Sequence, residues 1–210
     1  MGRGKHATSV DSHILGLVQS RPAGWVFTPA DLSDLGSRNA VAAALKRHKK
    51  AGLIRQIARG FYDRPRNHPQ FGVLAPDLKE VEQALKRRDA IRLQPTGTYA
   101  ANLLHLSTQV PVRIVYLTDG PTRRLRVGKT HIILRRTTPR NMATAGTASG
   151  LVIQALRWLG KKSDHSSTIP LLRKALSVDD LHRLASDARY APAWIATIMR
   201  EVSTNSEAPK

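Results

Sequence analysis

Residues 37–52 read SRNAVAAALKRHKKAG, and this run decides the fold of the first part of the chain. Ser37 is a residue type that favours the N-cap of a helix, and Gly52 suits the position just past a helix end. Between them, apolar or packable side chains recur at spacings 0, 3, 4 and 7, which is the period of one helix face. The residues of this face are Val41, Ala44, Leu45 and His48. The run therefore predicts an amphipathic helix that packs on a neighbour through this face.

The opposite face of the same helix is basic at both ends and small in the middle. Its residues are Arg38, Asn39, Ala42, Ala43, Lys46, Lys49 and Lys50. A helix that enters the major groove of DNA needs side chains of this kind, because small residues allow a close approach while cations meet the phosphates. The competing interpretation is a solvated basic helix face with no ligand.

The segments on either side of residues 37–52 place this helix in a larger motif. Ser9 is the expected N-cap of a first helix, and Thr28-Pro29-Ala30-Asp31 is a capping box with proline at the first helical position. Gly36 ends that second, short helix. After the third helix, residues 53–57 predict a strand, and Phe61-Tyr62 begins its return strand after a turn. This order predicts a winged helix-turn-helix over residues 9–64.

This motif predicts which side chains would touch DNA. The first residues of the second helix of a helix-turn-helix reach base edges, and arginine suits guanine whereas asparagine suits adenine. The predicted base-reading residues are Ser37, Arg38 and Asn39. The predicted phosphate contacts are Lys46, Arg47, Lys49, Lys50 and, at the tip of the wing, Arg59.

The remaining chain predicts a second domain of mixed composition. Residues 1–8 are expected to form a flexible basic arm, residues 65–76 a linker, and residues 203–210 a disordered tail. Residues 77–202 predict a C-terminal α/β domain with a small, mainly antiparallel sheet and a helical end. The expected fold class is therefore α+β. Strands are expected at 91–93, 112–117, 123–127 and 131–136, and helices at 77–88, 96–106, 147–159, 168–176, 178–187 and 191–202.

Net charge is the strongest compositional signal. The chain has 34 Lys and Arg against 15 Asp and Glu, a formal charge of +19. The excess is +8 in residues 1–70, +8 in 71–140 and +3 in 141–210, so a basic tail alone does not explain it. Such a charge predicts a polyanionic partner. A basic protein without that role is the alternative.

Several functional classes are disfavoured. No apolar run is long enough for a membrane span, no secretory signal is recognisable, and there are no cysteines, so a cytoplasmic protein without membrane contact is expected. No catalytic or metal-ligand motif occurs, so we expect no enzyme activity, metal or cofactor. A nuclease is the remaining enzymatic alternative. Its best carboxylates are Asp77, Glu80 and Glu82, which we interpret as part of a surface helix.

Particular stretches resemble a known family. They are residues 37–47, Lys50-Ala51-Gly52-Leu53-Ile54, Arg59-Gly60-Phe61-Tyr62, the run 96–111 that ends in Leu-Ser-Thr-Gln-Val-Pro, and Tyr116-Leu117-Thr118-Asp119-Gly120. Together they resemble AbiEi-type antitoxins of type IV toxin–antitoxin systems, over roughly residues 9–160. The first three stretches are unspecific winged-helix features, whereas the run 96–111 is more specific.

The resemblance implies a bacterial abortive-infection regulator that represses its own operon through inverted repeats. It implies a nucleotidyltransferase-like toxin as functional partner, counteracted without a stable complex. It places Arg38, Asn39, Lys46 and Arg47 on the recognition helix and Arg59 on the wing. A monomer in solution, or cooperative pairing on DNA, is expected. A stand-alone regulator with a ligand-sensing or dimerising C-terminal domain is the alternative.

The resemblance also implies an antitoxic surface in the basic C-terminal domain. Charge and strand position alone select its candidates, namely Arg113, Arg123, Arg124, Arg126, Arg135 and Arg136. Arg124, Arg126 and Arg136 share parity within their strands, so we expect them to share one face of a sheet. The competing interpretation is a solvated sheet face.

Overall fold

A computed structural model describes residues 9–204 and divides the chain into two units, Met1–Ala90 and Ile91–Lys210. Each unit combines helices with a small sheet, so the fold is mixed α+β. The expected basic arm, residues 1–8, lies outside the described residues, as do residues 205–210 of the expected tail.

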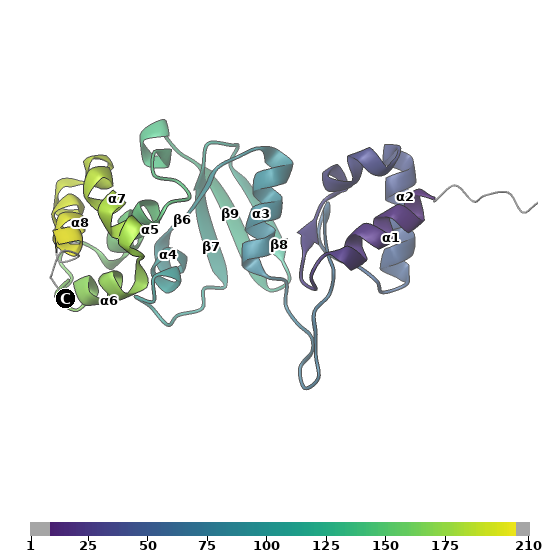
Figure 1. Cartoon of the computed structure of the whole chain (residues 1–210), viewed down its shortest axis with the longest axis horizontal. Coiled ribbons are helices and arrows are strands. Elements are labelled where there is room, and N and C mark those ends of the chain that lie inside the picture. The colour runs from purple at the N-terminus through teal and green to yellow at the C-terminus, as the bar shows by residue number, and fades with distance from the viewer. Residues whose placement is uncertain (1–8, 205–210) are drawn as a thin grey trace, which may run out of the picture. The chain divides into compact units, whose positions relative to one another are not determined.

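Three helical segments begin the first unit (Figure 1), and each starts at a cap that the sequence predicts. They are α1 Val10–Ser20, the 3₁₀ helix η1 Pro29–Leu35 and α2 Arg38–Lys50. Ser9 and Ser37 accept hydrogen bonds from backbone N–H groups of the first turn of α1 and α2. Thr28 and Asp31 form the capping box of η1. The second predicted helix is thus present in the tighter 3₁₀ form.

The core of the first unit lies between these segments. It consists of Ile14, Val18, Phe27, Leu32, Val41, Ala44, Leu45 and Ile54. Gly36 is needed at the junction of η1 and α2, because a Cβ atom there would stand 2.6 Å from Cγ2 of Val10. The close approach of this junction to α1 therefore requires a residue without a side chain.

A three-stranded antiparallel sheet completes this core. Its strands are β1 Val26–Phe27, β2 Arg55–Ala58 and β3 Phe61–Asp63, in the order β1-β3-β2. The hairpin from β2 to β3 carries a register shift between Gln56 and Ala58. Asp63 is buried, and Arg55 neutralises it through Nε, 3.0 Å from Oδ1.

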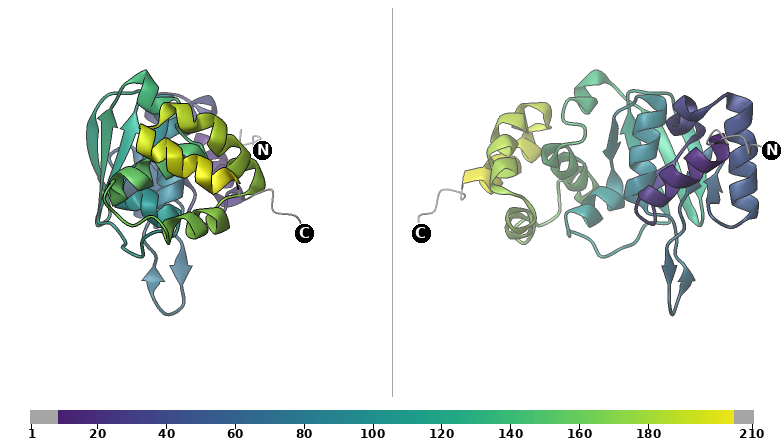
Figure 2. Two further views of the ribbon diagram at one scale, coloured as in Figure 1. Left: turned by 90° about the vertical axis from the view of Figure 1, so that its left-hand side faces the viewer. Right: turned by 45° about the vertical axis from the view of Figure 1, so that its right-hand side comes forward.

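Residues 65–76, expected as a linker, instead contain a second hairpin. Its strands are β4 Asn67–His68 and β5 Gly72–Val73. It extends away from α1 and α2, as Figure 1 and the right view of Figure 2 show. Its base is fixed to the sheet, since Arg55 Nη1 donates to the Leu74 carbonyl at 3.1 Å. The prolines of this segment flank strands rather than an irregular chain.

Helix α3, Leu78–Asp89, belongs to the first unit, although we expected residues 77–202 to form one domain. Arg87 donates to Asp31 Oδ1 at 3.1 Å and to the Val26 carbonyl at 2.9 Å. Arg88 lies over the ring of Phe61, 4.2 Å from its centroid. These contacts at the end of α3 place the division between the units after Ala90.

The second unit contains a four-stranded sheet in the order β6-β7-β9-β8. Its strands are β6 Leu93–Pro95, β7 Arg113–Thr118, β8 Arg123–Val127 and β9 Thr130–Arg136. Two of the three pairings are antiparallel, but β9 runs parallel to β7 and separates it from β8. One face carries the buried side chains of Ile114, Tyr116, Ile132 and Leu134.

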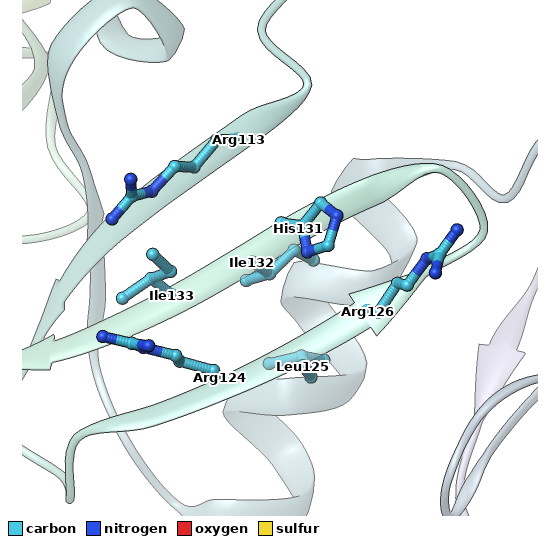
Figure 3. Close-up of a pocket in the computed structure, with 7 residues that line it drawn as sticks. All are labelled: Arg113, Arg124, Leu125, Arg126, His131, Ile132 and Ile133. Atoms are coloured by element: carbon cyan, nitrogen blue, oxygen red, sulfur yellow. The ribbon is translucent and has the colours of Figure 1, made fainter.

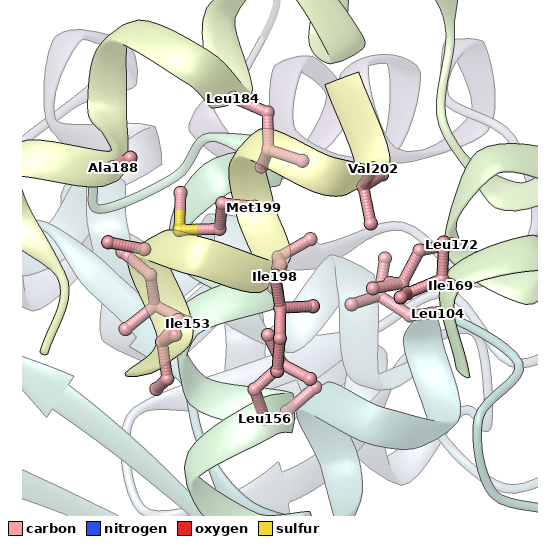
Figure 4. Close-up of a cluster of buried hydrophobic side chains, with 14 of the residues drawn as sticks. Leu104, Ile153, Leu156, Ile169, Leu172, Leu184, Ala188, Ile198, Met199 and Val202 are labelled. Atoms are coloured by element: carbon pink, nitrogen blue, oxygen red, sulfur yellow. The ribbon is translucent and has the colours of Figure 1, made fainter. Parts of the chain in front are cut away.

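Helices form the rest of the second unit. They are α4 Gly97–Leu103, η2 Pro139–Met142, α5 Ala148–Leu159, α6 Thr168–Ala175, α7 Val178–Asp187, η3 Ala188–Tyr190 and α8 Ala193–Thr204. All of them except η2 contribute to an apolar cluster that includes Leu156, Leu172, Leu184 and Met199 (Figure 4). Residues 203–204, expected in a disordered tail, belong to α8. None of the helices in residues 9–204 has the length and apolar character needed to cross a bilayer.

Candidate nucleic-acid interface

Helix α2 has the two faces that its sequence predicts. Val41, Ala44, Leu45 and His48 are buried, and the first three belong to the core. His48 is held by its ring, with Nε2 3.1 Å from the Asp11 carbonyl oxygen. The other face is exposed and carries Arg38, Asn39, Ala42, Ala43, Lys46, Arg47, Lys49 and Lys50. One face therefore anchors the helix, and the other is available to a ligand.

The start of α2 offers two exposed polar side chains. Ser37 Oγ accepts the N–H of Ala40 at 3.3 Å, so this predicted base-reading hydroxyl also caps the helix. The side chains of Arg38 and Asn39 have no hydrogen-bond partner within residues 9–204. A hollow of about 320 Å³ lies beside this turn, lined by Pro29, Ala30, Ser33, Gly36, Arg38 and Val41.

The cations at the other end of α2 fall into two pairs. Arg47 Nη2 lies 2.8 Å from Asp11 Oδ1 on α1, and Lys49 Nζ donates to Gln56 Oε1 on β2 at 2.9 Å. In contrast, Lys46 and Lys50 are exposed and have no polar partner in the described part of the chain. Their charge is thus uncompensated, whereas Arg47 already faces a carboxylate.

Arg59 lies at the tip of the hairpin between β2 and β3. Gly60 follows with a φ of +74°, a left-handed conformation that favours glycine and makes the tight turn possible. The side chain of Arg59 is exposed, and no residue between 9 and 204 neutralises it. The turn therefore presents a single free cation.

A second basic surface lies on the four-stranded sheet. Arg113 of β7 is opposite His131 of β9, and His131 is opposite Arg126 of β8. Because directly paired residues point to the same side of a sheet, these three side chains share a face. Arg124 lies two residues from Arg126 on β8, and Arg135 lies four residues from His131 on β9. Both therefore point to the same face, because side chains two or four residues apart on a strand share a side. We call this set, with His131, the arginine face.

Arg123 and Arg136 do not belong to the arginine face. Arg136 is opposite Thr118, and Arg123 is opposite Leu134. Both arginines are therefore on the other side of the sheet, because successive residues of a strand point to opposite faces. The expectation that Arg136 shares a face with Arg124 and Arg126 is therefore wrong. Parity tells which residues of one strand share a face. Which residues of neighbouring strands share a face depends on how the strands are paired, and the strand sequences alone do not show this register.

The arginine face is hollowed. An open depression of about 450 Å³ is lined by Arg113, Arg124, Leu125, Arg126, His131, Ile132 and Ile133. Figure 3 shows Arg113 and Arg124 on either side of Ile133, with His131 above the same strand. Sequence reasoning missed His131 and Ile133, although their parity with Arg135 places all three on one face.

Hydrogen bonds displace the pKa values of two exposed or partly exposed carboxyl groups, those of Asp119 and Asp164. The Arg92 side chain, with Nε 2.8 Å from Oδ2, lowers the pKa of the Asp119 carboxyl below its usual value, and partial desolvation opposes this effect. Backbone and side-chain hydrogen bonds from Ser166 lower the pKa of Asp164, which is fully exposed. Within residues 9–204 no three His, Asp or Glu side chains gather as a metal site would require.

Curated proteins provide no match to the chain. Among solved structures, the RV2827C protein from Mycobacterium tuberculosis is similar at 16% sequence identity and a TM-score of 0.45, over 95% of this chain and 78% of that one. A family model described as a family of unknown function, DUF6088, matches residues 13–184. Because this match spans most of the sequence, the chain belongs to the DUF6088 family.

Proposed function

We propose that residues 9–64 form a winged helix-turn-helix that binds duplex DNA. The observation that carries this proposal is the division of α2 into a buried face and an exposed face, on which Arg38, Lys46 and Lys50 have no polar partner among residues 9–204. In this proposal α2 enters the major groove, and Ala42 and Ala43 allow its backbone to come close to the bases. The hairpin from β2 to β3 is the wing, and Arg59 at its tip contacts the neighbouring phosphates or the minor groove.

The exposed side chains of α2 have separate roles in this arrangement. Arg38 and Asn39 are placed to read base edges, because a guanidinium pairs with O6 and N7 of guanine and an amide with N6 and N7 of adenine. Lys46 and Lys50 supply phosphate contacts that position the helix without selecting sequence. Arg47 contributes less to phosphate binding, because its guanidinium must give up its contact with Asp11 or hold the carboxylate and a phosphate at once.

We further propose that the protein is a cytoplasmic antitoxin of the AbiEi type that represses its own operon through inverted repeats. The resemblance of stretches within residues 37–62 and 96–120 to AbiEi-type antitoxins supports this role. A nucleotidyltransferase-like toxin is the proposed partner, counteracted without a stable complex. The protein acts as a monomer that pairs on the two half-sites of the operator.

Fluorescence anisotropy tests DNA binding. The probes are a labelled duplex of the region upstream of the gene and a random duplex of equal length. Arg38→Ala or Asn39→Ala is expected to weaken the upstream complex by about 1–3 kcal/mol for each lost bidentate contact, with little change on the random duplex. Equal losses on both probes would show that these residues contact the backbone only.

Co-expression with the product of the adjacent gene tests the antitoxin role. The full chain is expected to restore growth when both genes are transcribed from foreign promoters, so that repression contributes nothing. Arg38→Ala should retain this protection, because it alters DNA reading alone. Absence of protection by the full chain would contradict the antitoxin role and favour a stand-alone regulator.

A further inference from the structure

The arginine face carries positive charge without nearby compensation. Arg113, Arg124 and Arg135 are exposed and form no ion pair within residues 9–204, and Arg126 donates only to the Gly128 carbonyl, at 3.0 Å. From residue 112 to residue 136 the only acidic residue is Asp119, and Arg92 binds it. A cluster of unpaired guanidinium groups is complementary to phosphate.

The centre of the same face is apolar. Val115, Leu117 and Ile133 alternate with the buried residues of their strands and are half-buried on the arginine face. Ile133 lies between Arg113 and Arg124 (Figure 3). A ligand that fills this depression therefore combines an anionic backbone with flat apolar groups that can pack on aliphatic side chains.

We propose that the arginine face binds single-stranded RNA. The bases of a duplex are stacked inside the helix, so a duplex would use the arginines and leave the apolar centre exposed. Unpaired bases can instead lie on Ile133 and stack on guanidinium planes, while the phosphates meet the arginines.

His131 favours RNA over single-stranded DNA. Its exposed ring lies between Arg113 and Arg126 in the sheet register, at the place where the backbone of the ligand would run. A neutral imidazole offers one donor and one acceptor nitrogen, and the 2′-hydroxyl of RNA can also donate and accept. The site is built from the second unit alone, so it does not depend on the proposed role of α2.

The test uses the full chain and a labelled oligouridylate, with thymidylate of equal length and a random duplex as comparison probes. The main variant is Arg124→Ala with Arg126→Ala. The matched control is Lys161→Ala with Lys162→Ala, which removes the same charge from exposed positions of the second unit outside the sheet. Melting temperatures establish that each variant is folded.

Each phosphate contact contributes about 0.7 to the slope of log affinity against log salt for a single strand. The main variant should flatten this slope by about 1.4, which is about a 25-fold loss at about 0.1 M salt if the affinities converge near 1 M. Its duplex binding should stay that of wild type. An equal loss in the lysine control, or an equal loss on the duplex, would overturn the proposal.

Two further results test the nature of the ligand. Ile133→Thr keeps the β-branch and all charges, and is expected to weaken oligouridylate binding while leaving the salt slope unchanged. Oligouridylate should also bind more tightly than thymidylate, and His131→Ala should remove this preference. Wild-type affinity of Ile133→Thr would mean that bases do not use the apolar centre, and tighter thymidylate binding would exclude RNA as the ligand.

Discussion

Replacing Lys46 with alanine is the sharpest test of how α2 meets DNA. Lys46, Lys50 and Arg59 are the three proposed phosphate contacts that are exposed and free of a partner within residues 9–204. If each neutralises one phosphate, log affinity for a duplex falls with log salt at a slope of about −2.7. Raising salt from about 50 to 200 mM then weakens the complex by about 40-fold.

Lys46→Ala should reduce that slope to about −1.8, so that the same change in salt weakens binding by only about 12-fold. The assay is anisotropy of a labelled random duplex across a salt titration. Lys79→Ala is the control, because it removes an equal charge from an exposed position on α3 of the same unit. A slope unchanged by Lys46→Ala, or reduced as much by Lys79→Ala, would refute this placement of DNA on α2.

Three further predictions concern the scaffold. Gly36→Ala should destabilise the first unit by about 1–3 kcal/mol in urea unfolding, because its Cβ would clash with Val10, and adding Val10→Ala should recover most of that loss. Gly150→Ala should destabilise the second unit at least as much, since its Cβ would meet the Thr144 carbonyl oxygen, which is backbone and cannot rotate away; a wild-type midpoint would refute this. The pKa of Asp119 is lowered, so its bond to Arg92 contributes stability above about pH 3.8, and this contribution is lost as the pH falls below that value. Asp119→Asn should therefore lower the unfolding midpoint at neutral pH, and the midpoints of variant and wild type should converge in acid.

Helix boundaries in the first unit could be predicted because their causes are local. Ser9, Thr28 and Ser37 each form hydrogen bonds with groups within three residues, and the spacing of the buried residues from Val41 to His48 depends only on helix geometry. Strands β7, β8 and β9 of the second unit begin and end within one residue of the predicted bounds, since β-branched residues and turns mark them, whereas β6 lies two residues later than predicted. Their fold class, mixed α+β, followed from these elements.

Sheet order and long-range ion pairs could not be predicted in this way. The parallel pairing of β7 with β9 places β9 between two strands that precede it, and nothing in the strand residues encodes that order. The contact of Arg47 with Asp11 joins residues 36 positions apart. For the same reason, the sequence did not predict that α3 belongs to the first unit or that Arg136 lies away from Arg124.

The hairpin within residues 65–76 was missed for a different reason. Its strands contain two residues each, too few for a periodic pattern, and the surrounding prolines indicate a linker. His131 and Ile133 were overlooked because charge alone selected the candidates of the arginine face. The hollow they line is visible only once the register is known.

Selection from a pool of random duplexes tests the central claim most directly. The full chain should enrich an inverted repeat, because two copies of α2 read two equivalent half-sites. The double variant Arg38→Ala with Asn39→Ala should still retain duplexes at low salt through its remaining cations, yet enrich no motif. Failure of the wild-type chain to enrich any sequence, or enrichment of the same motif by the double variant, would contradict the assignment of α2 as the element that reads DNA.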